Sequence, residues 1–313
     1  MKRFKKVLLV PAALTLDDAA IQRAIRLCKA SGAHMSLCWP QDASSDGGTG
    51  LDYMPDVIAS IEGRLSELTD EIRSTHDISI DYRLDRGKLY LEVIRAVQHD
   101  GYDLVMKTAR GKSVGQQMLF GGDARQLLRK CPCPVWIVDP KETDESAVLA
   151  AVDPMTSDAE AEGLTTKILQ LATSLAAIED TEIHVVHAWA PPSERLRRNL
   201  SWLALPVAKS EEHIDTIRDQ HREALDKVLE PFRDEYPHIK THLVRGLAEQ
   251  VIPGVAMQIN AGTLVMATLA RSGIPGLLIG NTAEVVLNDI NRSVLVAKPD
   301  GFVSPLTLEA NAD

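Results

Sequence analysis

Aromatic residues and cysteines are scarce in this chain. Aromatics make up 4% of its 313 residues, so we expect a core of aliphatic side chains. The four cysteines, Cys28, Cys38, Cys131 and Cys133, all lie in the first half, which does not suit a disulfide framework and is typical of a reducing, cytoplasmic compartment. The run Cys131-Pro132-Cys133 has neither the C-x-x-C redox spacing nor a zinc-site spacing, so we interpret both thiols as small core residues.

Long apolar runs are also missing. No stretch of about 18 apolar residues occurs, so the sequence predicts no membrane-spanning helix. The N-terminal residues MKRFKKVLLVPAALTL superficially resemble a secretion signal. However, two aspartates follow at once, no cleavage site is visible, and the second half contains an equivalent stretch, AVLAAVDPMTSDAE. We therefore interpret Val7–Val10 as a buried strand of a cytoplasmic protein.

Basic residues are in the minority. The chain has 34 Lys and Arg against 44 Asp and Glu, which gives a formal net charge of −10. Nucleic acids and anionic membranes attract proteins through basic faces. The charge balance therefore argues against both as partners.

Motifs of common catalytic centres are absent. No H-E-x-x-H or G-x-S-x-G occurs, and Gly47–Gly50 lacks the Lys-Ser/Thr of a P-loop. His184 and His187 are three residues apart on an expected strand, hence on opposite faces, so they do not form a metal-binding pair. His213 and His221 fall on an expected helix, and we expect both to be solvated. We assign no catalytic and no metal-binding residue.

One pattern occurs twice along the chain. LVMKT at 104–108 corresponds to LVMAT at 264–268, MLFGGDARQLL corresponds to LLIGNTAEVVL, and VWIVDP corresponds to VLVAKP. In each copy, short apolar strands alternate with helices in the order βαβαβαβαβ. This order predicts an α/β fold of two tandem doubly wound parallel sheets, each with helices on both faces.

The domain limits follow from a polar, proline-containing stretch, DPKETDES, between the two copies. We place the domains and their connections at 1–140 (domain 1), 141–146 (linker), 147–298 (domain 2) and 299–313 (C-terminal tail). In the second copy, a helix is expected at Leu247–Ile259, and Pro253 inside it predicts a kink or a late start. Ligands of such sheets bind at the carboxyl ends of the strands. In domain 2 that edge includes Ala267–Asn281.

Both halves resemble universal stress protein domains, over nearly the whole chain. RKCPCPVW closes the first copy, and GLAEQVIP and GIPGLLIGNTAE occur in the second; in tandem they are similar to the E-type members of that family. The resemblance implies a Rossmann-like fold and a role in stress survival, with weak ATPase activity at most. It also implies a pseudo-dimer in which Val135–Val138 and Val294–Ala297 pair edge to edge, which protects two open sheet edges.

The nucleotide-binding members of the family carry an Asp after the first strand and the pattern G-x-x-G, nine residues, G-Ser/Thr after the fourth. In domain 2, Asp153 matches the Asp and Gly280 the third glycine, while Ala267 and Ala270 replace the first two glycines and Asn281 the Ser/Thr. Each alanine adds a Cβ where the backbone would need positive φ or close approach to phosphate, which disfavours ATP. The candidate ligand residues are Asp153, Ala267, Ala270, Arg271, Gly280, Asn281 and Thr282.

Domain 1 departs further from that pattern and is degenerate by comparison. Pro11-Ala12 stand where the Asp would be, and Lys107 and Arg110 replace the first two glycines. We therefore expect any nucleotide in domain 2 rather than in domain 1.

Three functions are compatible with the sequence. The leading hypothesis is a non-enzymatic stress-response protein that binds a small molecule, a protein partner or both. The second is an adenine-nucleotide binder with weak ATPase activity, with ATP in domain 2 as the possible cofactor. The third is a carrier of a lipid-like, apolar-anionic metabolite, with Ala190–Ser210 as a lid bearing Arg195, Arg197 and Arg198. Further pairing of the tandem chain into a homodimer stays open.

Overall fold

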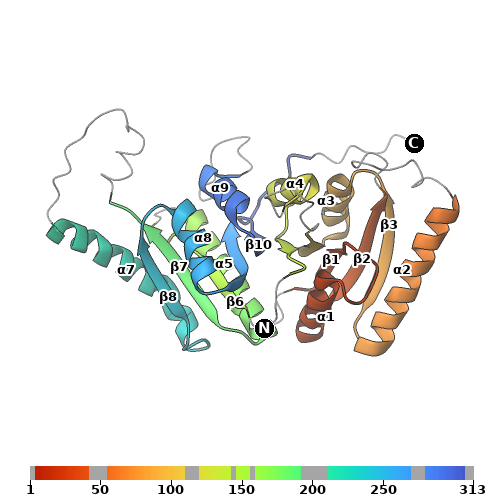
Figure 1. Cartoon of the computed structure of the whole chain (residues 1–313), viewed down its shortest axis with the longest axis horizontal. Helices are drawn as coiled ribbons and strands as arrows, with labels where there is room; N and C mark the ends of the chain where they lie inside the picture. The colour runs from red at the N-terminus through yellow and green to blue at the C-terminus, as the bar shows by residue number, and fades with distance from the viewer. Residues whose placement is uncertain are drawn as a thin grey trace.

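The computed structural model shows an elongated molecule with one sheet running through it. It describes residues 4–41, 55–109, 120–141, 146–155, 159–191, 211–268 and 279–306. The helices α7 (Glu211–Arg233) and α2 (Pro55–His76) lie at opposite ends (Figure 1). Among the described residues, we find no helix that combines the length and the apolarity needed to span a bilayer.

Strands and helices alternate in both halves. The first half contains β1 (Lys6–Val10), α1 (Ala19–Ser31), β2 (His34–Gln41), α2, β3 (Ile80–Arg86), α3 (Leu89–Asp100), β4 (Leu104–Thr108), α4 (Gly122–Lys130) and β5 (Val135–Val138). The second contains β6 (Ala147–Ala151), α5 (Ala159–Glu179), β7 (Ile183–Trp189), α7, β8 (Lys240–Arg245), α8 (Ala248–Gln258), β9 (Ala261–Ala267), α9 (Asn281–Asp289) and β10 (Ser293–Ala297).

The ten strands form one sheet in the order β3-β2-β1-β4-β5-β10-β9-β6-β7-β8. Neighbouring strands are parallel within each half. The halves join where β5 and β10 pair antiparallel, with Ile137 opposite Val294 and Val135 opposite Val296. The predicted α/β fold and the predicted edge-to-edge pseudo-dimer are both confirmed. The pairing also removes two open strand edges from the molecule.

Two hydrophobic cores cover the two faces of the sheet, and each extends through both halves. The helices α1, α2, α5 and α7 pack on one face, around residues such as Leu9, Leu68 and Leu171. The helices α3, α4, α8 and α9 pack on the other, around Leu8, Leu127 and Val286. Because each core contains side chains from both copies, the seam between the halves is part of the folded interior.

A buried ion pair crosses this seam. Arg23 on α1 is 4% exposed; it donates to Thr263 Oγ1 at 3.1 Å and pairs with Glu179 at 3.4 Å. The Arg23 guanidinium also lies 5.4 Å from the ring centre of Trp136, a fully buried residue of β5. A lone buried charge is costly, so these contacts fix the position of α1 against α5.

Local sequence signals explain most element ends. Asp18 caps α1, and Gly32 ends it in the left-handed region at φ 70°. Of the kink or late start expected for α8, the late start is wrong: the helix begins at Ala248 and continues past Pro253 to Gln258. A further proline, Pro231, lies near the end of α7 and was not singled out from the sequence.

Candidate functional site

The candidate site of domain 2 lies at the carboxyl edge of the sheet. Strands β6 and β9 are parallel neighbours, with Ala150 opposite Val265, so the segments that follow them leave the sheet at the same edge. Asp153 follows β6, and α9 follows β9 in the chain. The fold therefore brings the start of α9 and Asp153 to one side of the sheet, where ligands of doubly wound folds bind.

Asp153 presents its carboxylate to solvent. Its Oδ1 accepts a hydrogen bond from the backbone N–H of Met155 at 3.2 Å, and its main-chain oxygen accepts from the Thr165 hydroxyl at 3.4 Å. The side chain is exposed, although Val152 directly before it is buried. One weak turn contact leaves most of the acceptor capacity of this carboxylate available to a ligand.

The first turn of α9 is exposed at the same edge. Gly280 is the N-cap, its N–H donates to Thr268 O at 2.7 Å, and Asn281 and Thr282 are exposed. Within the described part of the chain, no side chain caps this helix. The N–H groups of its first turn therefore have no side-chain acceptor among the described residues, and the helix dipole favours an anion there.

The alanine argument needs a correction at one position. Ala267 ends β9 half-buried and is not among the residues with positive φ, so its Cβ imposes no backbone strain. Gly280 has φ −76°, which any residue can adopt. A Cβ at this position would lie 3.4 Å from Thr268 O, an ordinary van der Waals contact, so a larger residue would fit here without strain. Ala270 and Arg271 lie outside the described residues, as do Arg195, Arg197 and Arg198 of the expected lid.

The corresponding edge of domain 1 is built differently. Lys107, the counterpart of Ala267, is 5% exposed and its Nζ donates to Thr108 O at 3.2 Å. Pro11, which stands near the position of Asp153, is buried. Domain 1 thus has a buried lysine and a proline where domain 2 has an alanine and an exposed carboxylate.

Asp18 holds the loop after β1 together. Its Oδ2 accepts from the N–H groups of Ala12 and Ala13 at 2.9 and 3.2 Å, and its Oδ1 accepts from Ala20 at 2.9 Å. The Thr108 hydroxyl at the end of β4 donates to Oδ1 at 2.5 Å. This carboxylate thus caps α1 and also binds the loop and the neighbouring strand.

Histidines form two hydrogen-bonded pairs in domain 2. His221 is 7% exposed and its Nδ1 lies 2.7 Å from Nε2 of His187, so the expectation that it is solvated is wrong; His213 is exposed as expected. His184 stacks on His242, with 2.8 Å between their nitrogens. A carbonyl only accepts, so the contact of His187 Nδ1 with Val152 O at 3.2 Å places a proton on Nδ1.

These pairs are structural connections rather than a metal site. Val185 belongs to the core on the face covered by α7 and Val186 to the core on the other face, so the alternating residues His187 and His184 leave β7 on opposite faces, as predicted. Burial, followed by the neighbouring His184, lowers the pKa of His242. Among the described residues, no group of three or more His, Cys, Asp or Glu side chains is close enough to hold a metal ion.

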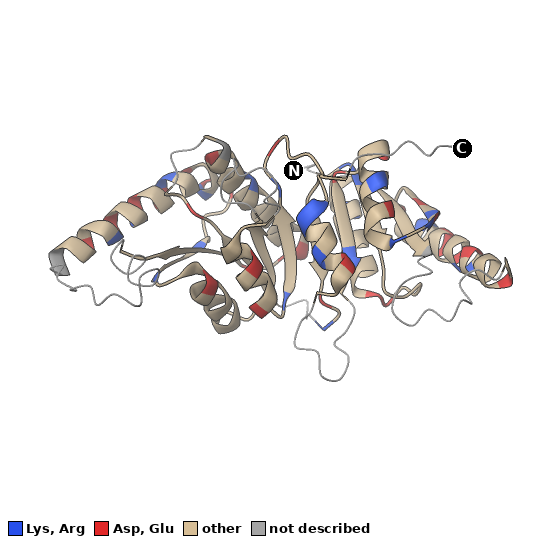
Figure 2. Ribbon diagram, turned by 90° about the horizontal axis from the view of Figure 1, so that it is seen from above, with Lys and Arg blue, Asp and Glu red and all other residues tan. Residues whose placement is uncertain are grey.

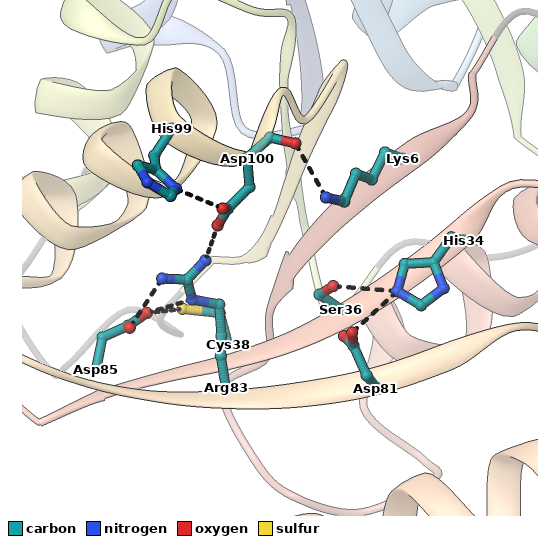
Figure 3. A network of polar contacts seen from close by, with 9 residues as sticks. All are labelled: Lys6, His34, Ser36, Cys38, Asp81, Arg83, Asp85, His99 and Asp100. Atoms are coloured by element: carbon teal, nitrogen blue, oxygen red, sulfur yellow. Dashed lines mark hydrogen bonds and ion pairs between the residues drawn. The ribbon is translucent and has the colours of Figure 1, made fainter.

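A polar network in domain 1 connects β3 to the end of α3 (Figure 3). Arg83 bonds both oxygens of Asp85 at 2.6 and 3.0 Å and one oxygen of Asp100 at 2.6 Å. Lys6 binds the main-chain oxygen of Asp100 at 2.9 Å. Burial, then the nearby Asp85, raises the pKa of the Cys38 thiol well above its usual range. Paired charges and an unreactive thiol indicate a structural role.

Surface charge is mixed. Figure 2 shows residues of both charges along the outer helices α2 and α7.

Comparisons with known proteins agree with this architecture. The model of the universal stress protein family matches residues 3–139 and 147–298. Universal stress protein E of Escherichia coli K12 is 29% identical over 310 residues, covering 95% of either chain. That of Photorhabdus laumondii is 28% identical, with 98% of each chain covered.

Solved structures show the same tandem arrangement. A protein of Pseudomonas aeruginosa UCBPP-PA14 described as a universal stress protein matches with a TM-score of 0.72 and 26% identity, covering 96% of this chain and 95% of its own. A universal stress protein of Archaeoglobus fulgidus matches with a TM-score of 0.62 and 16% identity, covering 95% of this chain and 99% of its own, and supports the fold alone. The chain belongs to the universal stress protein family as a tandem, two-domain member.

Proposed function

We propose that the chain is a non-enzymatic stress-response protein that binds one small anionic molecule at the carboxyl edge of domain 2. The observation that carries this proposal is the placement of an exposed carboxylate and an uncapped helix start at one sheet edge. Asp153 would accept a hydrogen bond from a hydroxyl or amino group of the ligand, and the first turn of α9 would bind its anionic group.

Domain 1 does not carry the same function in this proposal. Lys107 is buried where domain 2 has the smaller Ala267, and Pro11 stands near the position of the exposed acid. We place the domains at 1–140 and 147–298, with a linker at 141–146 and a tail from 299; the two matched ranges support these limits. All four cysteines are free thiols, which supports a cytoplasmic location.

Thermal unfolding tests the proposal. We expect phosphate, AMP, ADP or ATP, each with and without Mg²⁺, to raise the Tm of the wild type. A ligand at about 100 times its Kd adds about 2.7 kcal/mol of stability, which is several degrees for a chain of this size. The Asp153→Ala variant should lose most of that shift, and Lys107→Ala should keep it. An equal shift in both variants would place the ligand elsewhere.

ATP binding with weak ATPase activity is the second candidate. The ordinary backbone of Ala267 favours it, because the alanine there causes no strain. Replacing Ala267 and Ala270 together by glycine tests the remaining steric argument. If the double variant binds ATP and the wild type does not, side-chain bulk excludes the phosphates; if both bind equally, the alanines are tolerated and the chain is a nucleotide binder.

A further inference from the structure

Two cysteine side chains touch each other at the C-terminal end of α4. Cys131 is the C-cap, and its N–H donates to Leu127 O at 3.0 Å. The Sγ atoms of Cys131 and Cys133 are 3.6 Å apart, at van der Waals contact. The backbone bends at the intervening residue, Pro132, and turns both side chains to the same side. Cys131 is fully buried and Cys133 is 8% exposed.

The spacing permits a bond between them. Residues i and i+2 are at most about 7 Å apart along a chain, and disulfides join Cα atoms that are about 4.4–6.8 Å apart. Converting the 3.6 Å contact into a bond of about 2.05 Å therefore needs a local adjustment of the bend, without a movement of α4 or β5.

A buried lysine from the other half of the molecule lies next to this pair. Lys298 directly follows β10 and has no exposed surface. Its ammonium donates to the main-chain oxygens of Leu128 and Arg129, the latter at 3.3 Å, and to Thr268 Oγ1 at 2.9 Å. The ring of Phe302 covers it, with the ring centre 4.8 Å from Nζ. Domain 2 thus supplies a cation to the last turn of α4.

The electrostatics separate the two thiols. Burial opposes ionisation of Cys131, but its hydrogen bond with Cys133 and the charge of Lys298 outweigh burial and lower its pKa. Burial, followed by the hydrogen bond with Cys131, raises the pKa of Cys133. Burial lowers the pKa of Lys298 to about 8 despite the two thiols. One thiol is therefore favoured as the nucleophile and the other stays protonated.

We propose that Cys131 and Cys133 form a redox-active dithiol, which a hydroperoxide oxidises to an intramolecular disulfide. The geometry carries this inference. The two sulfurs are in contact, and a cation from the other domain acts on one of them; isolated core cysteines would have neither feature. The earlier interpretation of both cysteines as plain core residues followed from their spacing alone.

The chemistry has two steps. The Cys131 thiolate attacks the outer oxygen of the peroxide; an S–O bond forms, the O–O bond breaks, and the leaving oxygen takes up a proton to become water or an alcohol. The sulfur of Cys133 then attacks the sulfenic sulfur, so that an S–S bond forms and the S–O bond breaks. The proton of Cys133 leaves with the hydroxyl group as water. Two thiols lose two electrons, and one peroxide gains them.

The described part of the C-terminal tail lies over Lys298, whose charge acts on Cys131. Phe302 covers Lys298, and the Leu306 main-chain oxygen accepts from Gln98 on α3 at 3.2 Å. Leu306 packs against the core that contains both cysteines, whereas Val303 in the same tail is 81% exposed. A thin cover of this kind has a lower cost of local opening than a helix of the core. In this proposal, local opening of the tail admits the peroxide to Cys131.

The test is mass spectrometry of the folded full-length protein after treatment with hydrogen peroxide. We expect the chain to lose two hydrogen atoms at the peptide containing Cys131 and Cys133, about tenfold faster than Cys28 or Cys38 is modified. Burial raises the pKa of Cys28 to about 12, so this thiol serves as an unreactive internal reference. Met257 is 75% exposed, and its sulfoxide reports that the peroxide acted.

Variants separate a disulfide from other oxidation products. Cys133→Ser should abolish the loss of two hydrogens and leave Cys131 as a sulfenic acid, trapped by dimedone. Cys38→Ser should react like the wild type. Complete oxidation of Met257 with the Cys131 and Cys133 thiols intact would overturn the proposal. So would loss of all four thiols at one rate, because that result reports global unfolding.

Discussion

Replacing Asp18 by alanine tests the account of domain 1 most sharply. The carboxylate accepts the N–H groups of Ala12, Ala13, Ala20 and Ile21 and the hydroxyl of Thr108. It is 7% exposed, so water does not readily replace it. The variant therefore loses a helix cap and three further donors lose their acceptor.

The magnitude follows from these contacts. Loss of an N-cap costs about 0.5–2 kcal/mol. Each of the three other donors loses a hydrogen bond with a net value of about 1 kcal/mol, more where the donor stays buried. We expect Asp18→Ala to lower the free energy of unfolding by about 3–5 kcal/mol in total. Asp18→Asn keeps one acceptor oxygen and should lose roughly half as much.

The assay is equilibrium unfolding in urea, followed by circular dichroism. The matched control is Asp153→Ala, because Asp153 is exposed and its carboxylate accepts a single backbone hydrogen bond. That control should change the free energy of unfolding by about 0.5 kcal/mol or less. If the two alanine variants are equally stable, Asp18 does not organise the loop after β1 and the reasoning is wrong.

Two further substitutions test the seam between the halves. Arg23→Ala leaves the buried Glu179 without its closest cation and should lower the free energy of unfolding by about 3–5 kcal/mol. The side chain of Arg26 is 35% exposed and lies 3.6 Å from Glu179, so Arg26→Ala should lower it by under about 1 kcal/mol in the same urea titration. Equal effects would show that the ion pair does not stabilise the seam. For Lys298, the folded pKa of about 8 lies below the ordinary 10.5, so the unfolded chain binds the extra proton between these values. Wild-type stability should therefore rise from pH 8 to 10 relative to Lys298→Met, and a constant difference would contradict a buried ammonium.

The fold was predictable because strands and helices repeat with clear signals. Short apolar runs such as Val7–Val10 predict buried parallel strands, and the second copy confirmed each assignment independently. The pairing of Val135–Val138 with Val294–Ala297 followed from the family resemblance. The buried strands depend on local composition, and the pairing depends on each strand being the last of its half.

Contacts between distant residues were not predictable in the same way. His221 lies on a helix with polar neighbours, and only the packing of α7 on β7 brings it to His187. Arg23 is one of several polar residues on α1, and its burial depends on the second half of the chain. Sequence periodicity carries no information about such partners, because their separation is set by the topology of the sheet. For the histidine pair, the one signal in the sequence was a histidine on an expected helix, His221, in the same domain as a histidine on an expected strand, His187.

The candidate site was predictable in part. The position of Asp153 after β6 and of Gly280 at the start of α9 followed from the strand ends. At Ala267 the backbone part of the steric argument is wrong, because this residue at the end of a strand has no positive φ; the argument from close approach to a phosphate stays a prediction. Glycine positions in a motif do not by themselves reveal which of them requires glycine.

Native mass spectrometry of the freshly purified chain, compared with its mass after denaturation, tests the central claim most directly. We predict one bound small molecule per chain, absent from Asp153→Ala and present in Asp18→Asn. A mass matching ATP, ADP or AMP would identify a nucleotide, and a lipid mass would identify the carrier function. Two molecules per chain, a bound molecule that survives Asp153→Ala, or none in any preparation would contradict a single ligand site at the edge of domain 2.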